Sequence, residues 1–355
     1  MFSDASNFYA LLRYEEARHA LMACFKLEIV DQLAGGSFSQ QQFCQQFGFT
    51  KQGGRTFLHL LIAMDVIAAS NNAVDEFQIT LHAAECLSLT GDRSRRPYLQ
   101  MGRDETSDAL ISMLRGDFVG TSLYGEAGSQ HAASLMEDEQ TQEIAAEVAL
   151  GLASRARNFA IPLASCISSV LQELAIDEKL ILADIGAGSP YVARACLDEL
   201  PQIESALLVD QERGLQYANE LLKELPNAKG IETCTCNVFE SAPAANIYLL
   251  SNTAHDWLPE ACQKIYDNVH QTALSPSLLV LHEPLLVRPE EVSLQANQAL
   301  WMACYALALY KLTHGQGTCY LESEHDAMLS ESGFERVGSS MPTVDGCTAL
   351  LYRRK

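Results

Sequence analysis

The chain has 355 residues, of which 48% are hydrophobic and 19% charged, and its formal net charge is −21 at pH 7. This composition predicts a folded protein of about two domains rather than a disordered chain. The negative charge argues against nucleic acid or an anionic membrane as the main partner, because both repel an acidic protein.

Eleven cysteines are spread along the chain, and no two of them form a Cys-x-x-Cys pair. This spacing gives no support to a zinc site, so no metal is expected. Asp4 and Arg13 interrupt the first segment, which therefore lacks the apolar core of a signal peptide. The longest apolar run, 300–310, is too short to span a bilayer. We expect a cytoplasmic protein with reduced thiols.

The first hundred residues have the element order of a winged helix. An amphipathic helix is expected over 8–30, and Ser39 with Gln42 forms a capping-box signal for a short helix through Phe47. Thr50 is expected to cap a third, longer helix. The strands of a hairpin follow at 66–69 and 74–80, joined by an Asn-Asn turn.

A winged helix suggests DNA binding, but the charges in this region do not favour it. Residues 1–100 contain eight Lys or Arg and ten Asp or Glu. The third helix carries only Lys51 and Arg55 near its start, which is a poor surface for phosphates. We therefore interpret 1–100 as a mostly α winged-helix domain that forms a homodimer, with no nucleic acid and no membrane as partner.

Residues 101–165 are expected to form a helical connector, and the pattern changes at about 166. Short apolar runs then alternate with polar helical sequence, which predicts βαβ units and a parallel sheet of the Rossmann-like α/β class. The expected strands are 180–184, 206–210, 247–250 and 278–282. Two further strands, 334–340 and 347–352, are expected to close the domain 166–355 as an antiparallel hairpin.

A cofactor site is expected where the first strands of this sheet end. Gly186 and Gly188 follow the strand that carries Asp184, and Asp210 ends the next strand, 26 residues later. Such a carboxylate can accept hydrogen bonds from both hydroxyls of a ribose. After a third strand, Asn237 and Phe239 are positioned to bind and stack an adenine. Tyr191 occupies the place of a third glycine, which argues against a dinucleotide.

The segment 249–257, Leu-Leu-Ser-Asn-Thr-Ala-His-Asp-Trp, resembles the strand-four motif of a known family. This family comprises the class I S-adenosylmethionine-dependent O-methyltransferases with an N-terminal winged-helix dimerisation domain, including plant phenolic and bacterial natural-product enzymes. The resemblance covers nearly the whole chain, from Ala17 to the terminal hairpin. It implies a seven-stranded methyltransferase sheet, S-adenosylmethionine as cofactor and S-adenosylhomocysteine as product.

The resemblance also implies that His255 is the general base and that Glu283 orients it. Both residues follow strands, and a carboxylate on one ring nitrogen leaves the other to take a proton. The implied acceptor is a small, aromatic hydroxyl compound in an apolar pocket. The residues expected to contact the acceptor are Asp256, Met113, Phe159, Trp301, Met302, Tyr305 and His314. A stripe of Met and aromatic residues is more often part of a hydrophobic core than of a binding pocket.

The sequence departs from the family pattern at several positions. Ala187 and Pro190 replace two glycines of the cofactor loop, and Ser251, expected to lie at the cofactor, replaces a lysine. Asn237 replaces an acid, and the segment 315–320 lacks the second acid that flanks the histidine. Two alternatives therefore stay open: a cofactor-binding relative that catalyses hydroxylation, decarboxylation or a pericyclic reaction, and a catalytically silent dimeric scaffold.

Overall fold

The computed structural model describes residues 5–70, 75–89, 94, 96, 107–118, 139–226, 228–294, 296–343 and 346–355. The chain divides into two compact units, which are described separately. The first unit comprises Met1–Thr121 and Leu286–Leu321, and the second comprises Ser122–Leu285 and Glu322–Lys355. Segment 286–321, expected within a continuous domain 166–355, thus groups with the first unit. The boundary expected at 100–101 lies outside the described residues.

The first unit is mostly helical and has a three-stranded sheet in the order β1-β3-β2. The expected helix over 8–30 is two helices, because Glu28 adopts a left-handed conformation with φ of 52°. A short strand at 37–39 was not expected from the sequence. The elements are α1 (Ala5–Lys26), α2 (Ile29–Leu33), β1 (Ser37–Ser39), α3 (Gln40–Phe47), α4 (Lys51–Ala63), β2 (Ile67–Ala69), β3 (Glu76–Ile79), α5 (Leu81–Leu87), α7 (Ser107–Leu114), η4 (Pro289–Leu294) and α12 (Ala296–Leu312).

The helix starts in this unit follow the capping residues read from the sequence. The Ser39 backbone N–H donates to Gln42 Oε1 at 2.7 Å, and the Gln42 N–H donates to Ser39 Oγ at 3.3 Å. Thr50 Oγ1 accepts the N–H of Gly53 at 2.9 Å at the start of α4. Both caps satisfy donors that a helix leaves unpaired at its first turn.

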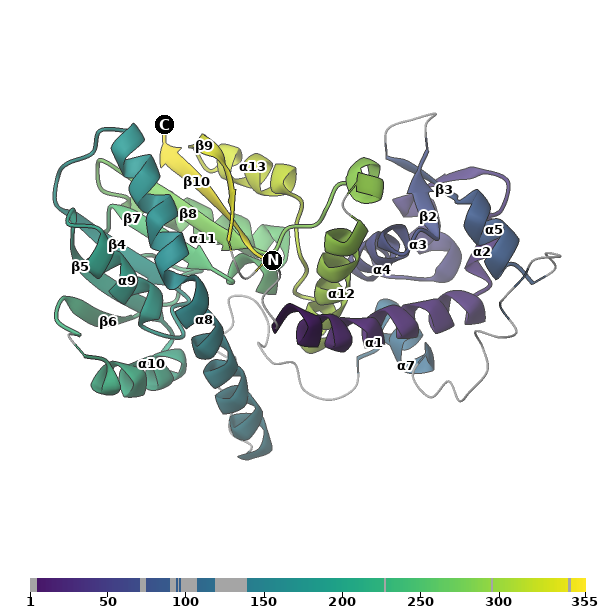
Figure 1. Ribbon diagram of the computed structural model, residues 1–355, viewed down its shortest axis with the longest axis horizontal. Coiled ribbons are helices and arrows are strands. Elements are labelled where there is room, and N and C mark those ends of the chain that lie inside the picture. Colours follow the sequence, from purple (N-terminus) through teal and green to yellow (C-terminus); the bar gives the residue numbers. More distant parts are fainter. Residues whose placement is uncertain are drawn as a thin grey trace. The chain divides into compact units, whose positions relative to one another are not determined.

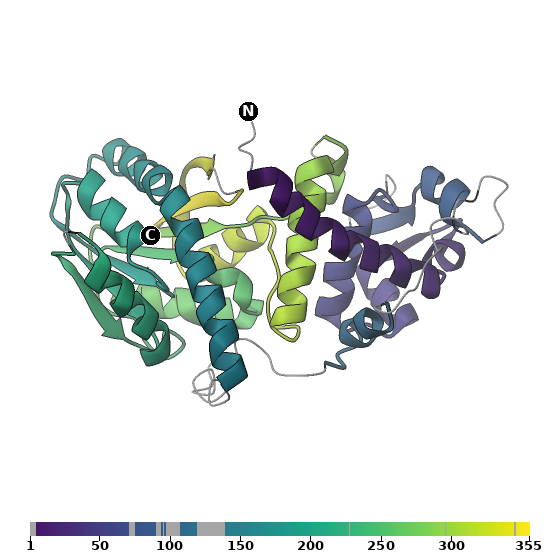
Figure 2. The same ribbon diagram turned by 60° about the horizontal axis from the view of Figure 1, so that its bottom comes forward.

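Helix α4, the counterpart of a DNA-recognition helix, is largely buried inside its own unit. Both α1 and α12 pack against it, and α12 lies beside α1 in Figure 2. Arg55, one of its two cations, is 9% exposed and donates to Thr318 Oγ1 at 3.3 Å and to the Cys319 carbonyl at 3.0 Å. This burial removes the helix face that would enter a DNA groove.

The second unit holds a seven-stranded sheet in the order β6-β5-β4-β7-β8-β10-β9, as expected. The first five of these strands are parallel, and β10 runs antiparallel to both β8 and β9. The strands are β4 (Leu180–Ile185), β5 (Ile203–Asp210), β6 (Ile231–Thr235), β7 (Ile247–Ser251), β8 (Leu278–Glu283), β9 (Phe334–Pro342) and β10 (Thr348–Arg354). The helices are α8 (Glu139–Glu173), α9 (Tyr191–Glu199), α10 (Glu212–Glu224), η3 (Ala254–Asp256), α11 (Pro259–Thr272) and α13 (Glu322–Glu331).

The strand order positions the site. The long helix α8 packs with α9 over the sheet in Figure 1, and every residue of β8 is buried. The chain moves outward from β4 through β5 to β6, then returns to place β7 on the other side of β4. The ends of β4, β5, β7 and β8 therefore meet at a topological switch point, where open α/β sheets bind ligands. Among the described residues, no helix is long and apolar enough to cross a membrane.

Candidate active site

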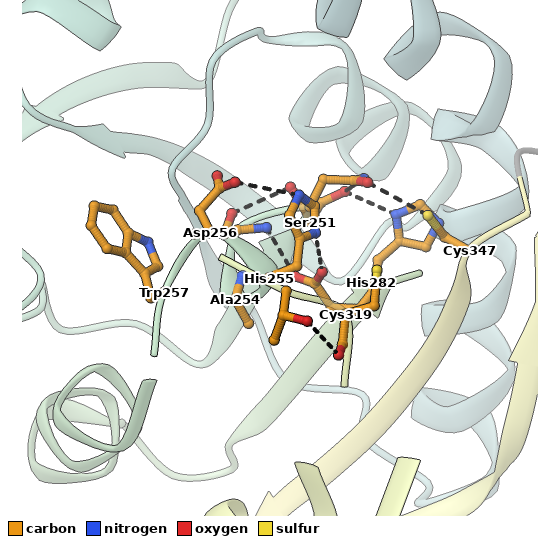
Figure 3. A network of polar contacts seen from close by, with 12 residues as sticks. Ser251, Ala254, His255, Asp256, Trp257, His282, Cys319 and Cys347 are labelled. Carbon is orange, nitrogen blue, oxygen red and sulfur yellow. Dashed lines mark hydrogen bonds and ion pairs between the residues drawn. The ribbon is translucent and has the colours of Figure 1, made fainter. Parts of the chain in front are cut away.

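His255, labelled in Figure 3, forms a buried pair with Glu283 at the carboxyl edge of the sheet. His255 lies in η3, directly after β7, and Glu283 ends the neighbouring strand β8. Nδ1 of His255 is 2.6 Å from Oε2 of Glu283, and the two residues are 4% and 0% exposed. The pair predicted from the sequence is therefore assembled in the structure.

Glu283 also fixes the backbone that carries the histidine. Its second oxygen, Oε1, accepts the N–H of Thr253 at 2.9 Å and the N–H of Ala254 at 2.8 Å. The Thr253 hydroxyl donates to the carbonyl of Ile185 at 3.1 Å, which ties this turn to the end of β4. Glu283 thus sets both the position and the tautomer of the His255 ring, because a carboxylate on Nδ1 holds the proton there.

The protonation of the pair follows from its surroundings. Burial works to lower the pKa of His255, but the charges of Glu283 and Asp256 and the hydrogen bond to Glu283 outweigh it, so its pKa is raised above 6.5. Burial works to raise the pKa of Glu283, but His255 and the N–H of Thr253 hold it below its usual value. Glu283 is therefore ionised at neutral pH.

Two more titratable groups surround this histidine. Asp256, the next residue, is 8% exposed and places Oδ1 3.6 Å from Nε2 of His255. His325 of α13 is 1% exposed and lies 3.4 Å from the Tyr266 hydroxyl through its Nδ1. Burial keeps the pKa of His325 below its usual value although Glu283 acts to raise it. The second carboxylate close to His255 thus comes from its own turn and not from segment 315–320.

A second buried histidine, His282, was missed in the sequence and lies beside the pair (Figure 3). Its Nδ1 is 2.9 Å from Ser251 Oγ, and its Nε2 is 2.8 Å from Thr343 Oγ1. Its backbone carbonyl accepts the N–H of Asn252, which has a left-handed φ of 55°. Ser251, which we expected at the cofactor, is therefore engaged by His282; the one signal for this contact is the adjacency of His282 and Glu283 in β8.

The glycine turn predicted from the sequence directly follows β4. Gly186 and Gly188 have φ of 69° and 51°, in the region that glycine adopts without strain. A Cβ on Gly186 would come within 2.9 Å of Thr253 Oγ1, whereas a Cβ on Gly188 would meet nothing closer than 3.9 Å. Pro190 is the N-cap of α9 and brings no N–H to this turn.

Asp184 and Asp210 are neighbouring acids at the ends of the paired strands β4 and β5. Asp184 is 3% exposed, and burial together with the charge of Asp210 raises its pKa well above the usual value. Asp210 is half-buried, and burial raises its pKa to about 6 against the hydrogen bonds from Gln211 and Gly188. Gly214, also missed in the sequence, makes room for Asp210, because a Cβ there would lie 2.5 Å from the carboxylate carbon.

Asn237 and Phe239 lie in the turn after β6. The Asn237 side chain donates to Glu240 Oε1 at 2.8 Å and accepts the N–H of Phe239 at 3.2 Å, so it shapes its own turn. The Phe239 ring packs edge-on against Trp257, with ring centroids 4.8 Å apart. Trp257 belongs to the His-Asp-Trp segment, which connects the expected adenine contact to the histidine turn.

The residues expected at the acceptor are divided between the two units. Met302 is 2% exposed and joins a core cluster of the first unit with half-buried Trp301 and Tyr305. His314 stacks on Phe118 in that unit, with ring centroids 5.0 Å apart. Met113 packs at the margin of the first unit's main core. Phe159 of the second unit packs on His282, and Asp256 stands beside His255.

The sheet order and the switch-point turn define an α/β protein of the class that binds a nucleotide-type cofactor. The model of the O-methyltransferase domain family matches residues 157–335, just over half of the chain. The chain therefore belongs to the O-methyltransferase family that this domain defines.

Individual relatives agree with this assignment. Columbamine O-methyltransferase of Coptis japonica is 20% identical over 249 residues, which cover 69% of this chain and 67% of that protein. Methyltransferase fsa4 of Fusarium sp. (strain FN080326) is 28% identical over 135 residues, so this chain spans only 36% of its length.

One solved structure matches nearly the whole chain. An O-methyltransferase family 2 protein of Planctomyces limnophilus DSM 3776, determined in complex with apigenin, has a TM-score of 0.81 and 21% sequence identity. The match covers 99% of this chain and 97% of that chain, which shows a common fold.

Proposed function

We propose that this protein is an S-adenosylmethionine-dependent O-methyltransferase that acts on a hydroxyl of a small aromatic acceptor. The observation that carries this proposal is the buried His255–Glu283 pair, 2.6 Å apart, at the sheet edge that also holds the glycine turn. A base beside a cofactor site has a direct use in methyl transfer, because the acceptor hydroxyl must lose its proton.

The residues of the switch point fit S-adenosylmethionine. The open space at the Gly188 Cα allows a ligand to approach the backbone closely, and the absence of a side chain at Gly186 leaves room for Thr253 to pack against the turn. Asp210 ends β5, where its carboxylate can accept hydrogen bonds from ribose hydroxyls. Phe239 and Asn237 lie in the turn after β6, which is proposed to hold the adenine.

The proposed mechanism assigns one task to each residue. S-adenosylmethionine, when bound, supplies an electrophilic methyl group. His255 accepts the proton of the acceptor hydroxyl at Nε2 while Glu283 holds the Nδ1 proton. Asp256 lies next to the Nε2 side, where it can bind the acceptor and stabilise the imidazolium. The chain otherwise contributes by aligning the acceptor oxygen, since proximity is a large part of such catalysis.

We also propose that residues 1–100 mediate a homodimer. Leu81 and Leu89, which are 86% and 52% exposed at the start of α5 and just beyond its end, are apolar side chains that such an interface would bury. DNA binding is less favoured, since α4 is covered within its unit and Arg55 is engaged.

The function is tested in two steps with the full-length protein. Calorimetric titration with S-adenosylmethionine and S-adenosylhomocysteine measures cofactor binding, and transfer of a labelled methyl group to a panel of phenols measures activity. His255→Ala should lower turnover by about 10²- to 10⁴-fold and keep cofactor binding. His82→Asn, an exposed histidine of α5, serves as the matched control.

Each outcome has a defined meaning. Absence of binding at millimolar ligand would refute the methyltransferase assignment and favour a silent scaffold. Binding without transfer to any phenol would instead favour a non-methylating relative that retains the cofactor.

A further inference from the structure

One face of helix α8 is directed at the strand ends near the catalytic pair. Phe159 is 4% exposed, and its ring centroid is 4.4 Å from that of His282, the residue before Glu283. Arg155 precedes Phe159 by four residues, so both side chains project from the same face of the helix. A cation is thereby brought to the edge of the sheet that carries the site.

The contacts of Arg155 fix its position relative to the histidine turn. Its Nη2 is 2.9 Å from Sγ of Cys347, and that sulfur contacts Asn252 Oδ1 at 3.5 Å. Asn252 lies three residues before His255, and Figure 3 shows Cys347 beside His282 and Ser251. The guanidinium thus lies near the end of β7 and the start of β10.

The electrostatics agree with this placement. The charged and titratable groups around His255 are Glu283, Asp256, Arg155 and His325. Among them, Arg155 acts to lower the pKa of His255, against the two carboxylates that raise it. Its positive charge therefore acts on the imidazole that is proposed to deprotonate the acceptor hydroxyl.

We propose that Arg155 recognises an anionic group of the acceptor, and that the preferred acceptors are hydroxylated aromatic acids rather than neutral phenols. The planar guanidinium matches a carboxylate with two parallel hydrogen bonds and keeps its charge at any physiological pH. Since the protein carries a net charge of −21, a local cation is needed to attract such an acceptor.

This inference rests on the proposed function but names a property that can fail separately. The competing explanation is that Arg155 only ties α8 to the start of β10 through Cys347. A structural tie predicts lower stability on substitution and no effect of acceptor charge. Recognition of an anion predicts that substitution of Arg155 weakens the binding of the charged acceptor much more than the binding of the neutral one.

The experiment compares two pairs of probes that differ in one charge. Salicylate and salicylamide place the charged group beside the hydroxyl, and p-coumarate and p-coumaramide place it at the end of a propenyl arm. Binding to the full-length protein saturated with S-adenosylhomocysteine is measured by calorimetry, for the wild type and for Arg155→Gln, Arg155→Lys and Arg157→Gln. Arg157 is exposed on the same helix, with its guanidinium 4.5 Å from the Tyr191 ring centroid, and is the matched control.

For at least one pair, the wild type should bind the acid about tenfold or more tightly than the amide. Arg155→Gln should reduce this ratio to about one, Arg155→Lys should retain part of it, and Arg157→Gln should leave it unchanged. Thermal unfolding shows whether each variant is folded. If Arg155→Gln does not fold, the comparison of acid and amide is made with Arg155→Lys instead.

Three results would overturn the inference: wild-type ratios near one for both pairs, no binding of either acid, or a ratio that survives Arg155→Gln. Labelled methyl transfer, measured in parallel, keeps the two proposals apart. Transfer to neutral phenols with no dependence on Arg155 would refute this inference alone. An Arg155-dependent preference without any methyl transfer would refute the proposed function alone.

Discussion

Glu283 binds the ring of His255 and, with its other oxygen, the two backbone N–H groups that precede this ring in the chain. The ring bond is 2.6 Å and the backbone bonds are 2.9 and 2.8 Å. One buried carboxylate therefore fixes the orientation, the tautomer and the charge state of the base together. Loss of this charge should change the pH dependence of catalysis as well as its rate.

The first prediction concerns the pH profile of turnover. The wild-type acid limb should have its midpoint above pH 6.5, because the pKa of His255 is raised and only the neutral ring accepts a proton. Glu283→Gln removes a negative charge that favours the imidazolium, so the midpoint should move to lower pH while the plateau falls about 10²-fold or more. Turnover measured from pH 5 to 9 checks this; an unmoved midpoint would mean that Glu283 acts on structure alone.

Cofactor affinity should depend on the ionisation of Asp210. The pKa of this carboxyl is raised to about 6 by burial, so protonation below that pH removes the acceptor for the ribose hydroxyls. Binding of S-adenosylhomocysteine should weaken as the pH falls through about 6. Asp210→Asn should bind about tenfold or more weakly at pH 8 and show a flatter profile. Calorimetry at several pH values is the measurement, and a parallel decline in the variant would assign the effect elsewhere.

Alanine at the two loop glycines should have separable effects. Gly186→Ala places a methyl group 2.9 Å from Thr253 Oγ1 at a positive φ, so both strain and a clash oppose it. We expect a loss of about 2 kcal/mol or more in unfolding free energy. Gly188→Ala meets no such contact and should cost about 1 kcal/mol, yet its methyl group projects into the space proposed for the ligand. Denaturant unfolding and cofactor titration of both variants decide this; equal stability losses would contradict it.

Ser251→Ala distinguishes a structural from a cofactor-binding serine. Removing Oγ takes away the partner of the buried His282 Nδ1, which should cost about 1 to 3 kcal/mol of stability. The affinity for S-adenosylhomocysteine should then change little. Ser169→Ala, on the exposed face of α8, should cost less than about 0.5 kcal/mol and is the control. Unchanged stability together with weakened binding would show that Ser251 contributes to cofactor binding rather than to the structure around His282.

Much of this fold is determined by local sequence. The caps at Ser39 and Thr50 and the apolar runs of the sheet each depend on neighbouring residues, so the helices and strands could be located before any contact was known. The pairing of His255 with Glu283 followed as well, because parallel strands bring their carboxyl ends to one edge. The break at Glu28 and the strand at 37–39 were missed because backbone conformation there is set by packing across the unit.

Other features required the tertiary structure. Whether His282 faces solvent, core or Ser251 depends on which side of the sheet α8 covers, and no local pattern states this. In the sequence Gly214 looks like any other residue of a helix, and only the fold shows that a side chain there would collide with the Asp210 carboxylate. Arg155 became a candidate only when the fold brought residues 155, 252 and 347 together.

The sequence by itself thus determined most of the elements and brought the strand ends to within a residue or two, because these depend on period, capping and chain order. The tertiary structure decided which charges act on one another, since electrostatic effects depend on distance and burial rather than on separation along the chain.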